Sequence, residues 1–95
     1  LARWRKLLPP LLESLPERVY LTVDMDYFDP SVVPGVGTPE PGGGLWYETL
    51  DLVGEIARSK RVVGFDIVEL CPPREKEASV RAATRLAASL LSKVL

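Results

Sequence analysis

Apolar positions recur along this chain with two different periods, and the shorter period predicts two β-strands. Residues 19–23 form a run of β-branched and aromatic side chains. Residues 62–70 form a second apolar run, interrupted only by Asp66 and Glu69. Runs that are apolar on both faces are typical of buried parallel strands. We therefore expect a strand over each run, covered on both sides.

Helical spacing marks the remaining apolar segments. Residues 46–59 and 76–95 repeat apolar positions three and four residues apart with charges between them, which predicts two amphipathic helices. Residues 1–15 hold two leucine clusters separated by Pro9 and Pro10. Because proline is tolerated in the first turn of a helix but not in its interior, we expect one helix to end at the prolines and another to begin there.

Residues 27–44 form a long segment that contains four prolines and five glycines. Such a composition excludes a regular helix or strand. The segment is also longer than an ordinary connection, and long loops are usually either functional or disordered. The fixed φ angles of the prolines favour an ordered loop.

The order strand, loop, helix, strand, helix predicts an α/β fold with parallel strands and a right-handed crossover. Two strands do not make a stable parallel sheet, because both faces and both edges need cover. The first residue is Leu and not Met, which fits a chain that starts in mid-protein. We expect residues 1–95 to be part of one larger domain, with the missing strands in an upstream segment or another chain.

Composition narrows the function classes. The chain is 46% hydrophobic and 26% charged, with a net charge of −1 and a pI near 5.4, which is typical of a globular protein. Lys and Arg are scattered, so a nucleic-acid surface is not expected. Cys71 is the only cysteine, which excludes an intrachain disulfide and is compatible with a reducing cytoplasm. No apolar run approaches the roughly 18 residues of a membrane span, and no secretory signal pattern opens the chain.

Asp24 and Asp26 follow the first predicted strand. Side chains two apart on a strand point to the same side, and two neighbouring carboxylates repel unless a cation lies between them. Ligation by oxygen alone suits Mn²⁺ or Mg²⁺ better than zinc. The carboxyl ends of parallel strands are also where ligands bind in open α/β sheets. The structural alternative is that both aspartates cap turns.

Two other acids have weaker interpretations. Asp29 precedes Pro30, and this pair is a common opening of a turn. Asp66 and Glu69 differ in parity, so a regular strand would send them to opposite faces unless a bulge or the strand end intervenes. We expect Asp66 to be structural and to hold neighbouring loop amides.

The chain resembles the arginase/agmatinase (ureohydrolase) family over residues 18–95. The motifs that match the family's last signature, spacings included, are Thr22-Val23-Asp24-Met25-Asp26, Asp29-Pro30, Pro34-Gly35 and Gly37-Thr38-Pro39-Glu40-Pro41-Gly42-Gly43. Residues 64–72 resemble the family's final strand, with its acidic residue before a proline. The sequence of residues 37–43 resembles agmatinases more than arginases.

The resemblance implies the C-terminal portion of a three-layer α/β/α sandwich with a central parallel sheet and two Mn²⁺ ions. These ions would activate a hydroxide that attacks the guanidinium carbon of an agmatine-like compound and releases urea. Asp24 and Asp26 match the family's last pair of metal ligands. Glu69 matches the carboxylate that holds the guanidinium, with a strand-end salt bridge as the alternative. A cytoplasmic homo-oligomer, trimer or hexamer, acting in polyamine biosynthesis is also implied.

The chain departs from the family pattern in ways that limit what it can do alone. The family's other metal ligands are a histidine and an upstream Asp-x-His-x-Asp run, and this chain has no histidine, including the one that relays protons. Gly44 stands where a larger apolar residue is usual, and Val80 where a threonine is common. We therefore expect that the isolated chain cannot build the two-metal site and is inactive, and we assign it no catalytic residue.

Two rival functions stay open at this point. Aspartyl-phosphate phosphatases also place Asp-x-Asp after an apolar strand and use Mg²⁺, although Phe28 and the Pro/Gly loop fit them poorly. The other rival is a catalytically inert or assembly-only piece of a ureohydrolase that folds against a partner.

Overall fold

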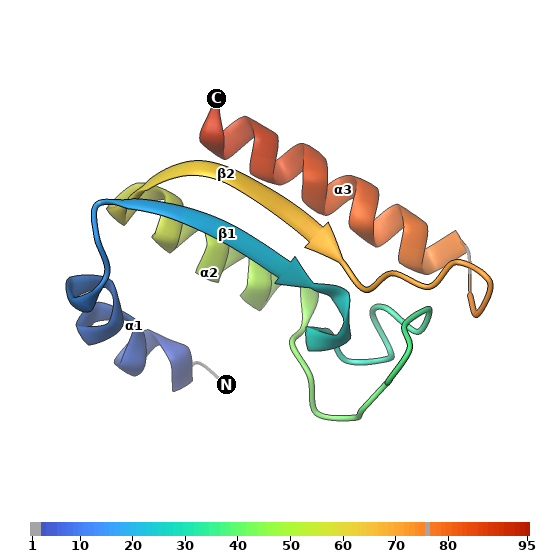
Figure 1. Ribbon diagram of the computed structural model, residues 1–95. Helices are drawn as coiled ribbons and strands as arrows, with labels where there is room; N and C mark the ends of the chain where they lie inside the picture. The colour runs from blue at the N-terminus through green and yellow to red at the C-terminus, as the bar shows by residue number, and fades with distance from the viewer. Residues whose placement is uncertain (1–2, 76) are drawn as a thin grey trace.

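The computed structural model describes residues 3–75 and 77–95. The first two residues of the predicted helical segment 1–15, and the first residue of the predicted helix 76–95, therefore lie outside the described residues. Figure 1 shows a strand–helix–strand unit between two further helices. The elements are α1 (Arg3–Ser14), β1 (Arg18–Asp24), the 3₁₀ turn η1 (Met25–Tyr27), α2 (Trp46–Ser59), β2 (Arg61–Val68) and α3 (Glu77–Val94). Over the part of the chain that is described, no helix has the length and apolarity to cross a membrane.

The strands β1 and β2 pair in parallel, as predicted, with one irregularity between Val19 and Tyr20. In Figure 1, α2 runs behind both strands and α3 runs alongside β2. One face of the sheet packs against these helices. The core comprises Val23, Met25, Phe28, Val33, Val36, Val53, Leu86 and Leu90, with Leu21, Phe65 and Ile67 packed against it.

The opposite face of the sheet and the outer edge of β1 have less cover. Tyr20, on the face away from the core, is 58% exposed. An apolar groove of about 250 Å³ lies between β1 and α2, and no residue of β2 lines it. Among the described residues, β1 has one neighbouring strand. A parallel strand is normally buried on both faces, so this sheet needs further cover.

The helix α1 corrects the prediction of two short helices, because Pro9 and Pro10 lie inside one continuous helix. Proline already has the φ angle of a helix, so its cost comes from lost hydrogen bonds and a clash with the preceding turn. The two carbonyls that lose their partners belong to Arg5 and Lys6, which are exposed and can bond to water instead. Arg5 also pairs with Asp51 of α2, at 3.3 Å.

The long loop is ordered, as predicted, because both its ends and its middle are fixed. The Asp29 amide donates to the Gly44 carbonyl and the Gly44 amide to the Tyr27 carbonyl, both at 2.9 Å. In the middle of the loop, Val33 and Val36 are fully buried. The loop therefore folds back over the carboxyl ends of the strands.

Candidate functional site

The carboxyl ends of both strands carry the acids that the sequence singled out. Asp24 is the last residue of β1 and lies opposite Val68, the last residue of β2. Glu69 follows directly, and Figure 1 shows the two strands ending side by side. Glu69 is exposed and has a φ of 68°, which is uncommon for a residue other than glycine. Glu69 lies outside β2, so the alternation of side chains along the strand, which would place it on the face opposite Asp66, does not apply to it.

Asp24 and Asp26 are held differently from the prediction. Asp26 lies in η1 and not on the strand, so the two side chains are not related by strand alternation. Asp24 instead caps η1, and its Oδ1 accepts a hydrogen bond from the Asp26 amide at 2.8 Å. The capping role that we weighed as an alternative is therefore present for Asp24. It leaves the second oxygen of that carboxylate free of the cap.

The Asp26 carboxylate has one satisfied and one unsatisfied oxygen. Its Oδ2 accepts a hydrogen bond from the Thr38 hydroxyl at 2.9 Å. Its Oδ1 is buried and has no hydrogen-bond partner among the described residues. A buried polar atom without a partner needs an explanation, and a bound cation is one. This oxygen is therefore suited to the role of a metal-ligand atom.

Two carboxylates alone do not make a full set of metal ligands. Within residues 3–75 and 77–95, no group of three or more His, Cys, Asp or Glu side chains is arranged to hold a metal ion. Carboxylate oxygens suit Mn²⁺, so Asp24 and Asp26 fit such an ion as two members of a larger set.

Asp29 holds the loop in place through hydrogen bonds to its side chain. Its carboxylate accepts hydrogen bonds from the Ser31 hydroxyl at 2.6 Å, the Ser31 amide at 3.0 Å and the Gly42 amide at 2.9 Å. These bonds, those from Ser31 first, hold the pKa of Asp29 below its ordinary value. Asp29 therefore performs the turn role that the Asp-Pro pair predicted.

Asp66 bonds across the sheet. The Tyr20 hydroxyl donates to its Oδ2 at 3.2 Å, whereas we had expected loop amides as its partners. Desolvation, together with this contact, raises the pKa of Tyr20. The Oδ1 of Asp66 is buried without a partner among the described residues. Asp66 lies on the sparsely covered face of the sheet, which it shares with Tyr20.

Gly44, which departs from the family pattern, has a structural explanation. A Cβ atom at this position would overlap the ring of Tyr27. The Tyr27 hydroxyl in turn forms a hydrogen bond of 3.0 Å with the hydroxyl of Thr49 in α2, whose own proton goes to the Leu45 carbonyl at 2.7 Å. Tyr27 thus fills the space that a larger side chain at position 44 would take. Val80, the other departure from the family pattern, is 37% exposed, and the structure gives no explanation for it.

Three residues near the strand ends escaped the sequence analysis as functional positions. Thr38 belongs to a family motif that gives it no role of its own, and Glu75 and Ser79 belong to none of the motifs. Glu75 precedes α3 and accepts hydrogen bonds from amides of its first turn, and an acid at the start of a helix is a usable signal because it complements the helix dipole. The contact of Thr38 with Asp26 had no such signal.

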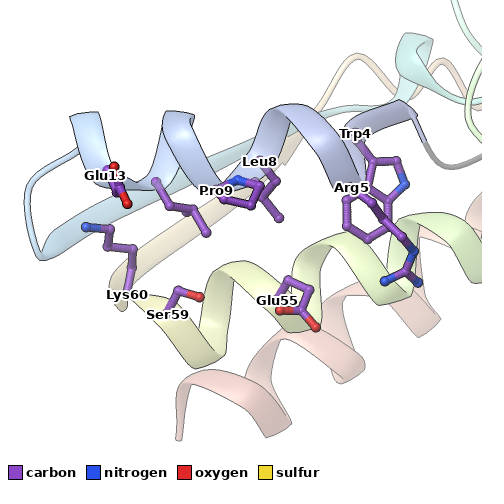
Figure 2. A pocket seen from close by; sticks show the side chains of 9 residues that line it. Trp4, Arg5, Leu8, Pro9, Glu13, Glu55, Ser59 and Lys60 are labelled. Atoms are coloured by element: carbon purple, nitrogen blue, oxygen red, sulfur yellow. The ribbon is translucent and has the colours of Figure 1, made fainter.

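A cavity elsewhere in the molecule has no link to these acids. It measures about 520 Å³ and lies between α1 and α2, as Figure 2 shows. Its charged lining mixes Arg5 and Lys60 with Glu13 and Glu55. None of Asp24, Asp26 and Glu69 lines it, so cavity volume does not locate the site.

Comparison with known sequences finds relatives for most of the chain. A sequence model of the arginase family matches residues 3–93. The N(1)-aminopropylagmatine ureohydrolase of Synechocystis sp. is 47% identical over 75 residues, which cover 79% of this chain and 24% of that protein. The agmatinase of Pyrococcus horikoshii is 41% identical over 76 residues, covering 80% of this chain and 27% of that protein. The chain thus spans about a quarter of the length of these relatives.

Solved structures agree with the sequence matches. An arginase from Bacillus subtilis superposes with a TM-score of 0.81 at 29% identity, over 95% of this chain and 32% of that one. The agmatine ureohydrolase of Thermoplasma volcanium superposes with a TM-score of 0.76 at 33% identity, over 90% of this chain and 29% of that one. The predicted fold class, a portion of an arginase-like α/β fold, is confirmed.

Proposed function

Because this chain belongs to the arginase family, we propose that it is the C-terminal part of a single ureohydrolase domain. The complete domain hydrolyses a guanidino compound and releases urea. The observation that supports this most is that Asp24, Asp26 and Glu69 all lie at the carboxyl end of the paired strands. Asp24 ends β1, Asp26 lies in the turn that follows, and Glu69 follows β2. The match with the arginase family also favours a ureohydrolase over the phosphatase alternative.

In this proposal Asp24 and Asp26 hold Mn²⁺ together with ligands from the upstream part of the domain. Mn²⁺, when bound, supplies activation of water for attack on the guanidinium carbon. Asp26 contributes the buried Oδ1 that has no partner among the described residues, while Thr38 keeps its other oxygen in place. Asp24 contributes the oxygen that η1 does not use.

Glu69 binds the substrate guanidinium. A carboxylate paired with a planar guanidinium forms charge-assisted hydrogen bonds that can be bidentate. Glu69 is exposed at the carboxyl end of β2, so its side chain is available to a ligand at this edge. No described salt bridge involves Glu69, and the structure thus gives no support to the strand-end ion pair.

The names of the relatives support a substrate class. Several of those most similar to this chain are named agmatinases or N(1)-aminopropylagmatine ureohydrolases. We therefore assign an agmatine-like guanidino amine as the substrate, within polyamine biosynthesis. We further assign a cytoplasmic location and a homo-oligomer, trimer or hexamer, to the complete enzyme.

The isolated chain is a separate matter. The described residues contain no group of three possible metal ligands, which favours a piece that assembles with the rest of a ureohydrolase and is inactive alone. This second candidate function and the first are compatible, because one concerns the chain and the other the domain that it completes.

Urea release tests the proposal. The complete protein containing this chain, loaded with Mn²⁺, is assayed with agmatine, N(1)-aminopropylagmatine, arginine and a phosphomonoester. We expect urea from at least one of the two guanidino amines, more slowly from arginine, and no phosphate release. Phosphate release, or no urea from any guanidino compound, would contradict the proposal. Urea release by residues 1–95 alone would contradict the inactive-piece assignment.

A further inference from the structure

A buried hydroxyl joins the long loop to the start of α3. Ser79 is fully buried. Its Oγ donates a hydrogen bond to Oε1 of Glu75 at 2.6 Å and accepts one from the Gly35 amide at 2.7 Å. Because an ionised carboxylate can only accept, the hydroxyl must donate to Glu75, and its lone pair is left for Gly35.

Glu75 is itself held in place, so it fixes the direction of this hydroxyl. It accepts hydrogen bonds from the amides of Ala78 at 3.0 Å and Ser79 at 2.9 Å, which caps α3. The hydrogen bonds from Ser79 are the main reason why the pKa of Glu75 lies below its ordinary value. The cap and the buried hydroxyl thus form one hydrogen-bonded unit.

Gly35 lies too close to this unit for a side chain. A Cβ atom there would overlap the Glu75 carbonyl oxygen and lie 2.8 Å from the Ser79 hydroxyl. On its other side, the Gly35 carbonyl accepts a hydrogen bond from the Cys71 amide at 2.7 Å. The next residue, Val36, forms an antiparallel bridge with Leu70. The loop is therefore bonded to the two residues that follow Glu69.

The same stretch of loop reaches the metal-ligand candidates. Thr38 donates to Asp26 Oδ2 at 2.9 Å. Residues 35–38 thus connect the segment after Glu69 with the carboxylate of Asp26. The positive φ of Glu69 is a conformation that persists only where its surroundings maintain it.

We propose that Ser79 is a positioning residue, which fixes residues 35–38 and so sets where Glu69 stands relative to Asp26. The inference rests on the proposed function, since it takes Glu69 as the group that binds the guanidinium. Without the hydroxyl, the Gly35 amide loses its partner in a buried place and the loop must shift to find another. A displacement of about 1 Å in a substrate-binding group costs as much as a hundredfold in rate.

The first measurement compares Ser79→Ala with Ser92→Ala in the complete, Mn²⁺-loaded enzyme. Ser92 lies on the same helix and is exposed, and the one partner of its hydroxyl among the described residues is the Ser89 carbonyl at 2.7 Å. We expect Ser79→Ala to lower kcat/KM for the guanidino substrate about tenfold, mostly through KM, with manganese content unchanged. Ser92→Ala should match the unmodified enzyme. Normal kcat/KM in a folded, metal-loaded Ser79→Ala variant would overturn the inference.

The second measurement combines Ser79→Ala with Glu69→Gln. If Ser79 acts through Glu69, Ser79→Ala lowers kcat/KM much less when Gln already replaces Glu69. Equal fold losses in both backgrounds would overturn the inference, because Ser79 would then act on the fold as a whole. Normal kcat/KM in Glu69→Gln alone would overturn the proposed role of Glu69, and the inference with it. If Ser79→Ala does not fold, Ser79→Cys, of similar volume and weaker hydrogen bonding, takes its place.

Discussion

The hydrogen bond from Thr38 to Asp26 predicts that a residue outside the ligand set controls metal affinity. Thr38→Val keeps the shape of the side chain and removes the hydroxyl that donates to Asp26 Oδ2 at 2.9 Å. The Asp26 carboxylate can then rotate, because this oxygen loses its described partner. The buried Oδ1 that we assign to the metal would no longer be held in one orientation.

The size of the effect follows from the environment of Thr38. A hydrogen bond to a charged group contributes about 1.5–3 kcal/mol. Thr38 is exposed, so water replaces part of the bond and the lower end of this range applies. Since about 1.4 kcal/mol corresponds to a factor of ten, we expect a roughly tenfold weaker affinity for Mn²⁺. Losses of this order are typical when a group that orients a metal ligand is removed.

The assay is titration of the metal-free complete enzyme with Mn²⁺ against a chelator of known affinity. Thr84→Val is the matched control, because within the described part of the chain the Thr84 hydroxyl has one partner, the carbonyl of Val80 in its own helix, at 2.8 Å. Thr38→Ser should keep most of the affinity. An unchanged Mn²⁺ affinity in Thr38→Val would refute the reasoning, as would an equal loss in Thr84→Val.

Three further predictions concern binding, packing and pH. Glu69→Gln should lower kcat/KM roughly ten- to hundredfold, through loss of about 1.5–3 kcal/mol, with manganese content unchanged; loss of a metal ion would move Glu69 into the ligand set. Gly44→Leu should destabilise the complete enzyme by about 1–3 kcal/mol in thermal unfolding, because its side chain overlaps the Tyr27 ring; the double variant with Tyr27→Gly should recover part of this, and equal stability of single and double variants would contradict the overlap. The pKa of Asp29 in the folded chain is lowered from its ordinary value of 3.8, so Asp29 stabilises the loop above the unfolded pKa, and this stabilisation is lost as pH falls through the folded pKa. Asp29→Asn should flatten this acid dependence of the free energy of unfolding. An unchanged dependence would argue against the role of Asp29 in fixing the loop.

The sequence predicted most elements because their signals are local. The helix over residues 46–59 was predicted with the bounds that α2 has, and both strands were placed within a few residues of β1 and β2. Apolar periodicity, bounded by prolines and glycines, is enough for this. The family motifs likewise indicate the acids at the strand ends.

What could not be predicted depends on residues far apart in the chain. Ser79 meets Gly35 across 44 positions, and Thr38 meets Asp26 across 12. No period or motif encodes such contacts. The continuity of α1 through Pro9 and Pro10 escaped prediction for a different reason: it depends on the exposure of Arg5 and Lys6, whose carbonyls the prolines leave without a helical partner.

The central claim, that Asp24 and Asp26 hold the metal of a ureohydrolase, is tested most directly by manganese analysis of the complete enzyme. Asp24→Asn and Asp26→Asn each keep the shape of the side chain and remove the charge. We predict that manganese content and urea release fall together in both variants, measured after gel filtration. Full manganese content in both variants would remove these residues from the ligand set and contradict the account.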